Sequence, residues 1–249
     1  MSFYIGMGSL RMNDNNLFRS WLGKILTPGV PANQTGSFQN EAYIRSILKE
    51  SKQKRHEMNR SIKEIPFTFL DTETTGFHAD AGDEIISIAL AQSINGKVNN
   101  EYYSYINPNR NIPPHITELT KIEQTHVEKA PSLSSVMNQV LSLLSGSVII
   151  GYHIQHDLNF LNYFLWNHGR LKLTQQTVEL RQVVEALHQK TFQTLDDALM
   201  YYGIICEARH DAQSDVHAML KLWMAILQVL QQKHIDSLYD LYALLNTKS

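Results

Sequence analysis

The sequence has a single cysteine, Cys206, among its 249 residues. An intramolecular disulfide is therefore impossible, and nothing argues for an oxidising compartment. A chain of this size buries roughly 70 to 75% of the surface that its unfolded form exposes, so it can build a core without disulfides or a structural metal. At about 150 residues per domain, the length indicates one large domain, or one ordinary domain with an extension.

Long apolar runs and a targeting signal are also lacking. No run approaches the ~18 apolar residues that span a bilayer. The chain does not begin with the basic, apolar and small-residue segments of a secretory signal. We therefore expect a soluble, intracellular protein of the cytoplasm with no membrane partner.

The chain has no excess of positive charge. Lys and Arg number 22 against 24 Asp and Glu, for a net charge of -2. Proteins that bind duplexes without sequence preference usually carry a basic footprint, so the global charge gives no support to a nucleic-acid partner. Residues 45–64 do carry a local charge of +4, from seven basic and three acidic side chains. We interpret this stretch as a solvated helix leading into the domain rather than as a nucleic-acid contact.

The first chemically informative segment is an extended run that starts at Pro66. Phe67, Phe69, Asp71 and Glu73 fall on one side of a predicted strand, which a Thr-Thr-Gly turn ends. Two like charges on a half-buried face raise each other's pKa and favour protonation unless a cation lies between them. The pair is thus a candidate divalent-metal site. The alternative is a strand end where both carboxylates face solvent.

Three more strands and several helices follow. Runs 84–93 and 97–106 meet at Asn95-Gly96, which suits a type I′ turn and predicts an antiparallel hairpin. The apolar run 148–150 predicts a buried strand. Helical spacing of apolar residues appears around 136–144, 161–165, 180–187, 195–202 and 216–230. The segment between 112 and 131 is interpreted as a loop. Residues 175–180 are interpreted as part of the packed core, because Leu180 belongs to an apolar stripe. This order predicts a mixed sheet with helices on its faces.

Two of the predicted helices begin with an acidic residue that points inward. At about 100° per residue, Asp157 lies within roughly 40° of Leu161 and Phe164 on the core-facing stripe. Asp215 lies four residues before Met219, again near a buried stripe. An acid in a first helical turn ordinarily interacts with the helix dipole or caps the helix. The inward orientation disfavours that interpretation.

A histidine precedes the second of these acids. His210 and Asp215 would be about 140° apart on one continuous helix, so they share a site only if His210 lies in the loop before it. The intervening residues are rich in helix-capping types and permit this. Among the 11 histidines, His153 and His156, near Asp157, are the only other serious candidates.

Taken together, these motifs resemble those of the DEDDh 3′-to-5′ exonucleases, which include the proofreading epsilon-type subunit of bacterial replicative DNA polymerase. Segments 71–76, 151–161 and 210–215 look like the family's three motifs, in order. The resemblance covers about residues 66–230 and implies an α/β fold of the RNase H-like type, with a mixed five-stranded sheet and helices on both faces. We expect a mainly helical N-terminal extension over 1–65 and a helical tail over 231–249.

The resemblance also implies a catalytic set. Its metal-binding carboxylates would be Asp71, Glu73, Asp157 and Asp215, and its general base His210. Two Mg²⁺ or Mn²⁺ ions suit such carboxylate ligands. The turn formed by Thr74, Thr75 and Gly76 is the expected substrate contact.

The implied function is a metal-dependent 3′-5′ exonuclease. It would release nucleoside 5′-monophosphates from the 3′ end of single-stranded DNA, in replication proofreading or repair, and a DNA polymerase subunit is a candidate partner. One alternative is an RNA-trimming 3′-5′ exoribonuclease. Another is a non-catalytic, polymerase-associated binding module, which the intact acidic set argues against because unused buried charges cost stability.

Overall fold

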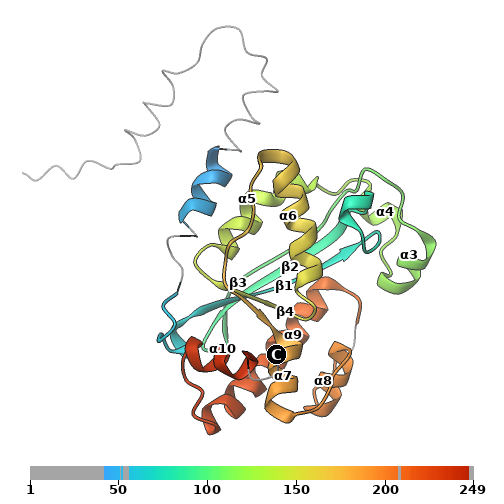
Figure 1. Ribbon diagram of the computed structural model, residues 1–249. Coiled ribbons are helices and arrows are strands. Elements are labelled where there is room, and N and C mark those ends of the chain that lie inside the picture. The colour runs from blue at the N-terminus through green and yellow to red at the C-terminus, as the bar shows by residue number, and fades with distance from the viewer. Residues whose placement is uncertain (1–41, 51, 53–55, 207–208, 247–249) are drawn as a thin grey trace, which may run out of the picture. The chain divides into compact units, whose positions relative to one another are not determined.

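A computed structural model describes residues 42–50, 52, 56–206 and 209–246 (Figure 1). The expected helical structure of residues 1–41 lies outside this range. A central sheet has the strand order β3-β2-β1-β4-β5. The strands are β1 (Pro66–Thr74), β2 (Ile85–Ile94), β3 (Lys97–Tyr105), β4 (Val148–Gly151) and β5 (Thr177–Glu179). Strands β1 to β3 pair antiparallel, whereas β4 pairs parallel with both β1 and β5. The mixed five-stranded sheet is confirmed.

The predicted hairpin between β2 and β3 is also confirmed. Asn95 and Gly96 have φ angles of 51° and 74°. Both values are positive, as a type I′ turn requires, and its twist matches that of the flanking strands.

Two parts of the sequence prediction were incomplete. The segment between 112 and 131 contains two short helices, α3 (Pro114–Thr120) and α4 (Gln124–Val127), where a loop was expected. Proline punctuates loops but is also favoured at the first position of a helix, where Pro114 lies. The fifth strand, β5, was not located because three residues are too short to show an alternating pattern.

Helices cover both faces of the sheet, as expected (Figure 1). One face carries α5 (Leu133–Leu144) and α6 (Gln155–Gly169). The other face carries α7 (Leu180–His188), α8 (Leu195–Tyr201), α9 (Ala212–Gln232) and α10 (Leu238–Asn246). Two short 3₁₀ helices, η1 (Ile62–Glu64) and η2 (Ala79–Ala81), flank β1. No helix in the described part of the chain is long and apolar enough to cross a membrane.

Strand β1 lies at the centre and contributes to both cores. Phe67 and Phe69 face α9, and the rings of Phe67 and Trp223 lie 5.0 Å apart. Leu70 points to the other face, against α5 and α6. Burial on both sides fixes the register of β1, because a shift of one residue would exchange its two faces. The position of Asp71 and Glu73 is therefore fixed by the packing of the strand that carries them.

Residues on both sides of 66–230 take part in the packing. A helix over residues 42–50 buries Ile47 and Leu48 in the core beside α5. At the other end, Leu238 and Leu241 of α10 are fully buried beside α7 and α9. The domain boundaries at 65 and 230 stay predictions.

Candidate active site

Three carboxylates meet at the end of β1. Asp71 and Glu73 leave the strand on its α9 side, and Asp215 approaches from the first turn of α9. One oxygen from each of the three lies within 4.8 Å of the others. The sequence spacing predicted that Asp71 and Glu73 share a face of the strand. The fold places Asp215 beside them.

The start of α9 is set by a capping interaction. Asp211 is the N-cap, and its side chain accepts a hydrogen bond of 3.0 Å from the Ser214 amide. His210 precedes the cap in a left-handed conformation, with φ of 60°. The prediction that His210 lies in the loop before the helix is confirmed. Its side chain and that of Asp215 line the same cavity.

The fourth predicted carboxylate, Asp157, comes from the opposite side of the sheet. It is buried in the first turn of α6, as its place on the core-facing stripe predicted. Thr72 of β1 donates a hydrogen bond of 2.6 Å to its Oδ1. Asp157 is not a member of the group within 4.8 Å, so it lies beside the three rather than among them.

Strand β5 holds the beginning of α6 in place. The carboxylate of Glu179 accepts hydrogen bonds of 3.0 Å from the amides of His153 and Ile154. Gly151 allows β4 to pass close to β1, because a Cβ there would lie 3.0 Å from the Leu70 carbonyl oxygen and 2.7 Å from Ile154 Cδ1. These contacts fix the position at which α6 begins, and therefore the position of Asp157 in its first turn.

Burial and like charge raise the pKa of three of these acids, Asp71, Glu73 and Asp157. Burial raises the pKa of Asp71 well above its ordinary value, and the neighbouring Asp157 and Glu73 raise it further. Burial, followed by the charge of Asp157, raises the pKa of Glu73 to about 7. Burial likewise raises the pKa of Asp157 to about 7, against the Thr72 hydrogen bond, which lowers it. A group of acids in this state is stabilised by a cation.

The donor set fits a divalent ion. All of its ligand atoms are carboxylate oxygens, which suit Mg²⁺ or Mn²⁺ better than zinc. A cationic side chain already contacts the group, since Arg209 Nη1 forms an ion pair with Asp215 Oδ1. The residues therefore favour positive charge at this position. We conclude that the site fits the divalent metal that such a cluster requires.

The carboxylates open into a cavity of about 180 Å³. Thr74 and Gly76 of the predicted substrate turn line it. Thr75 instead supports the turn, since its amide donates to the Glu84 carbonyl at 2.8 Å and its hydroxyl accepts from the Glu84 amide at 3.0 Å. The role of all three as substrate contacts stays a prediction.

Two apolar side chains at the mouth of this cavity were not singled out from the sequence. Phe77 is 73% exposed and Leu119 is 45% exposed, although both line the cavity. The available sequence signal for Phe77 was its position directly after the Thr-Thr-Gly turn. Leu119 lies on α3, in the segment interpreted as a loop, and had no such signal.

The other two candidate histidines have different positions. His156 lines the cavity, and burial lowers its pKa. Its ring packs against Phe77 with the centroids 5.8 Å apart. His153 is exposed, and its Nε2 lies 3.0 Å from the Gln193 carbonyl oxygen, so it is directed away from the acids. Only His156 joins His210 at the site.

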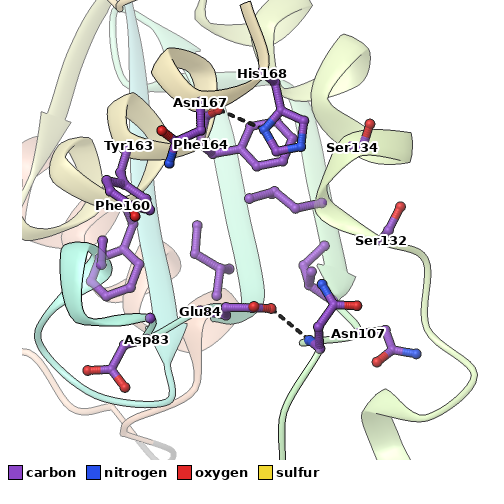
Figure 2. A pocket seen from close by; sticks show the side chains of 16 residues that line it. Asp83, Glu84, Asn107, Ser132, Ser134, Phe160, Tyr163, Phe164, Asn167 and His168 are labelled. Atoms are coloured by element: carbon purple, nitrogen blue, oxygen red, sulfur yellow. Dashed lines mark hydrogen bonds between the residues drawn. The ribbon is translucent and has the colours of Figure 1, made fainter. Parts of the chain in front are cut away.

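A second cavity, of about 370 Å³, lies beside α6 (Figure 2). Phe160, Phe164 and Tyr163 line it together with the carboxylates Asp83 and Glu84. No Lys or Arg is among its lining residues. The acids of the smaller cavity, in contrast, lie close enough together to share a metal ion that could bind a phosphate, so the smaller cavity is the better candidate for phosphodiester chemistry.

The chain is similar to known nucleases. A family model described as "Exonuclease" (RNase_T) matches residues 68–223. The 3′-5′ exonuclease DinG of Bacillus subtilis (strain 168) is 32% identical over 184 residues, which cover 70% of this chain and 19% of the relative. A PolC-type DNA polymerase III of Streptococcus pneumoniae is 25% identical over 180 residues, which cover 72% of this chain and 12% of the relative. The chain thus spans a fifth or less of these relatives.

A solved structure shows the same fold. The nuclease domain of 3′hExo, described as a DEDDh family member bound to rAMP, superposes with a TM-score of 0.60 at 16% identity. The match covers 68% of this chain and 94% of that domain. The five-stranded sheet with its two helical layers therefore has the fold of that domain.

Proposed function

Because the chain belongs to the RNase T exonuclease family, we propose that it is a metal-dependent 3′-5′ exonuclease acting on single-stranded DNA. The observation that carries the proposal is the meeting of Asp71, Glu73 and Asp215 oxygens within 4.8 Å, in a cavity that His210 also lines. The reaction would hydrolyse the terminal phosphodiester bond and release a nucleoside 5′-monophosphate.

We assign the metal-holding role to Asp71, Glu73, Asp157 and Asp215, with two Mg²⁺ or Mn²⁺ ions as the expected complement. When bound, the ions would make a water nucleophilic and stabilise charge on the departing 3′ oxygen. The first three acids are prepared for this by burial, which disfavours their charged forms until a cation arrives.

We assign the role of general base to His210. Histidine changes charge near neutral pH, so its neutral ring can accept a proton from an attacking water. His210 lies on the loop before α9, and its left-handed backbone sets it apart from the helix that carries Asp215. Both side chains can therefore reach one reacting group from different directions.

The terminal nucleotide would be held at the turn after β1. Thr74 and Gly76 line the cavity, and Phe77 and Leu119 stand exposed at its mouth. Bases stack on exposed aromatic rings with little sequence preference. A ring in this position supports an unpaired terminal nucleotide rather than a duplex end.

DNA is the proposed substrate, and a polymerase or another replication enzyme the proposed context. The relatives named DinG 3′-5′ exonuclease and DNA polymerase III support both parts. Roles in proofreading and repair, and association with a polymerase subunit, are part of the same proposal. The likeness to a domain bound to rAMP supports the fold alone and does not identify the substrate.

The test is turnover of matched oligomers. Single-stranded DNA and RNA of identical sequence, each with a 5′ fluorescent label, are incubated with the protein and Mg²⁺ or Mn²⁺. The proposal expects shortening from the 3′ end, faster on DNA, and no shortening with EDTA. A preference for RNA would change the proposed substrate from DNA to RNA but keep the proposed reaction. The absence of metal-dependent shortening of both oligomers would reject the proposed function.

A further inference from the structure

Arg209 lies between the acidic cluster and helix α8. Its Nη1 forms an ion pair with Asp215 Oδ1, and its Nε donates a hydrogen bond of 2.6 Å to Asp196 Oδ1. The arginine side chain is 19% exposed, and that of Asp215 is 9% exposed. Asp196, on α8, is 52% exposed. One guanidinium thus joins a buried acid of the site to a solvated acid outside it.

The charge of Arg209 acts on the whole cluster. It opposes the effect of burial by lowering the pKa of both Asp71 and Glu73. An arginine keeps its positive charge at all working pH values, so it can serve as a permanent counter-ion for buried carboxylates. The contact also engages the carboxylate of Asp215, one of the three residues of the candidate metal-ligand group.

We propose that Arg209 is an internal counter-cation, which occupies Asp215 in the metal-free protein and is displaced from it by the incoming divalent ion. The inference rests on the proposed function, because it concerns the same acids. It adds a residue that competes with the metal and therefore sets the metal concentration at which the site fills.

The second contact gives the displaced side chain a place to remain. Asp196 is more exposed than Asp215 and holds the guanidinium through Nε, an atom not used at the cluster. The Nη1 end can therefore leave Asp215 while the Nε bond persists. A divalent ion carries twice the charge of the guanidinium and binds several carboxylates at once, so it replaces the arginine when it is abundant.

The test compares Mn²⁺ binding and thermal stability in the full chain. Arg209→Gln removes the competitor, and we expect the Kd for Mn²⁺, measured by calorimetry after EDTA treatment, to fall by about tenfold, which is the scale of one charge-assisted hydrogen bond. Without metal the variant should melt roughly 2 to 4 °C below the wild type, because the acids lose their counter-ion. Saturating Mn²⁺ should close that gap.

The matched control is Arg110→Gln. It makes the same change of charge at an ion pair of 3.0 Å with Asp83, in which the arginine side chain is 39% exposed, outside the cluster. An equal gain in Mn²⁺ affinity in this control would overturn the proposal in favour of a general effect of net charge. A melting gap for Arg209→Gln that persists in saturating Mn²⁺ would also overturn it, since Arg209 would then only join α8 to the site. Failure of the wild type to bind Mn²⁺ would instead reject the proposed function.

Discussion

Glu73 and Asp157 make the metal-free protein sensitive to pH. Burial raises both pKa values to about 7, whereas in the unfolded chain such groups titrate near 4. As pH rises from about 4 towards 7, the unfolded chain releases these protons before the folded protein does. The folded state therefore loses stability across this window, and the loss is complete above about pH 7.

We predict that the melting temperature of the metal-free protein falls between about pH 4 and pH 7. Saturating Mn²⁺ should remove most of that fall, because the ion replaces the missing protons. Differential scanning fluorimetry with EDTA or Mn²⁺ measures both curves. Parallel curves in the two conditions would show that the acids do not hold a metal.

His210 should affect the rate without affecting the binding of metal. We expect His210→Ala to lower kcat by about 10²- to 10⁴-fold, the usual contribution of a general base. The Kd for Mn²⁺ should stay within about twofold because His210 is not a proposed ligand. His168→Ala, at the second cavity, is the control. A variant that keeps the wild-type kcat would assign the base elsewhere, with His156 the next candidate.

At the scale of elements, β1 joins the two halves of the site. Its odd-numbered residues Asp71 and Glu73 face α9, and the even-numbered Thr72 faces α6 and Asp157. The alternation of a strand therefore places four acids from three elements around one strand end. The hydroxyl of Thr72 is the link between the two sides.

We predict that Thr72→Val weakens the site through Asp157. Valine keeps the shape of the side chain but leaves a buried carboxylate oxygen without its donor, which costs about 1 to 3 kcal/mol of stability. The pKa of Asp157 should rise further, because the lost hydrogen bond lowers it now. We expect the Kd for Mn²⁺ to increase by about tenfold, as for other losses around metal ligands.

Thr68→Val provides the comparison. Thr68 is also buried on the same strand, and its hydroxyl donates to the Leu143 carbonyl oxygen at 3.0 Å, away from the acids. It should lose similar stability and keep its affinity for Mn²⁺. Equal losses of affinity in both variants would mean that Thr72 acts only through general stability.

The sequence predicted those features that neighbouring residues determine, and missed those that depend on contacts between distant residues. The Asn95-Gly96 turn, the shared face of Asp71 and Glu73, and the loop position of His210 all follow from neighbouring residues. The contact of Glu179 with the start of α6 does not, because three-residue β5 has no detectable period and its partner is 25 residues away. Arg209 was missed for the same reason, since its partners are set by the packing of α8 and α9.

At the scale of the whole molecule, the protein is nearly neutral, but its negative charge is concentrated at one site. The net charge is -2, yet Asp71, Glu73, Asp157 and Asp215 are gathered at one end of the sheet. Global charge is therefore a poor guide to the proposed partner, because a bound divalent ion would turn this region from repelling a phosphate to attracting it. The packing of residues 42–50 and α10 against the two cores adds stability around this site rather than chemistry within it.

The central claim is that these acids catalyse metal-dependent removal of 3′ nucleotides, and the most direct test compares Asp71→Asn with Asp80→Asn on a 5′-labelled single-stranded DNA. Asp80 is an exposed acid of η2, near the site but outside the cluster. The wild type and Asp80→Asn should give the same Mn²⁺-dependent ladder of shortened products. Asp71→Asn should be slower by about 10³-fold, the scale of several kcal/mol of metal stabilisation, while remaining folded by circular dichroism. A folded Asp71→Asn that degrades the DNA at the wild-type rate would contradict the account.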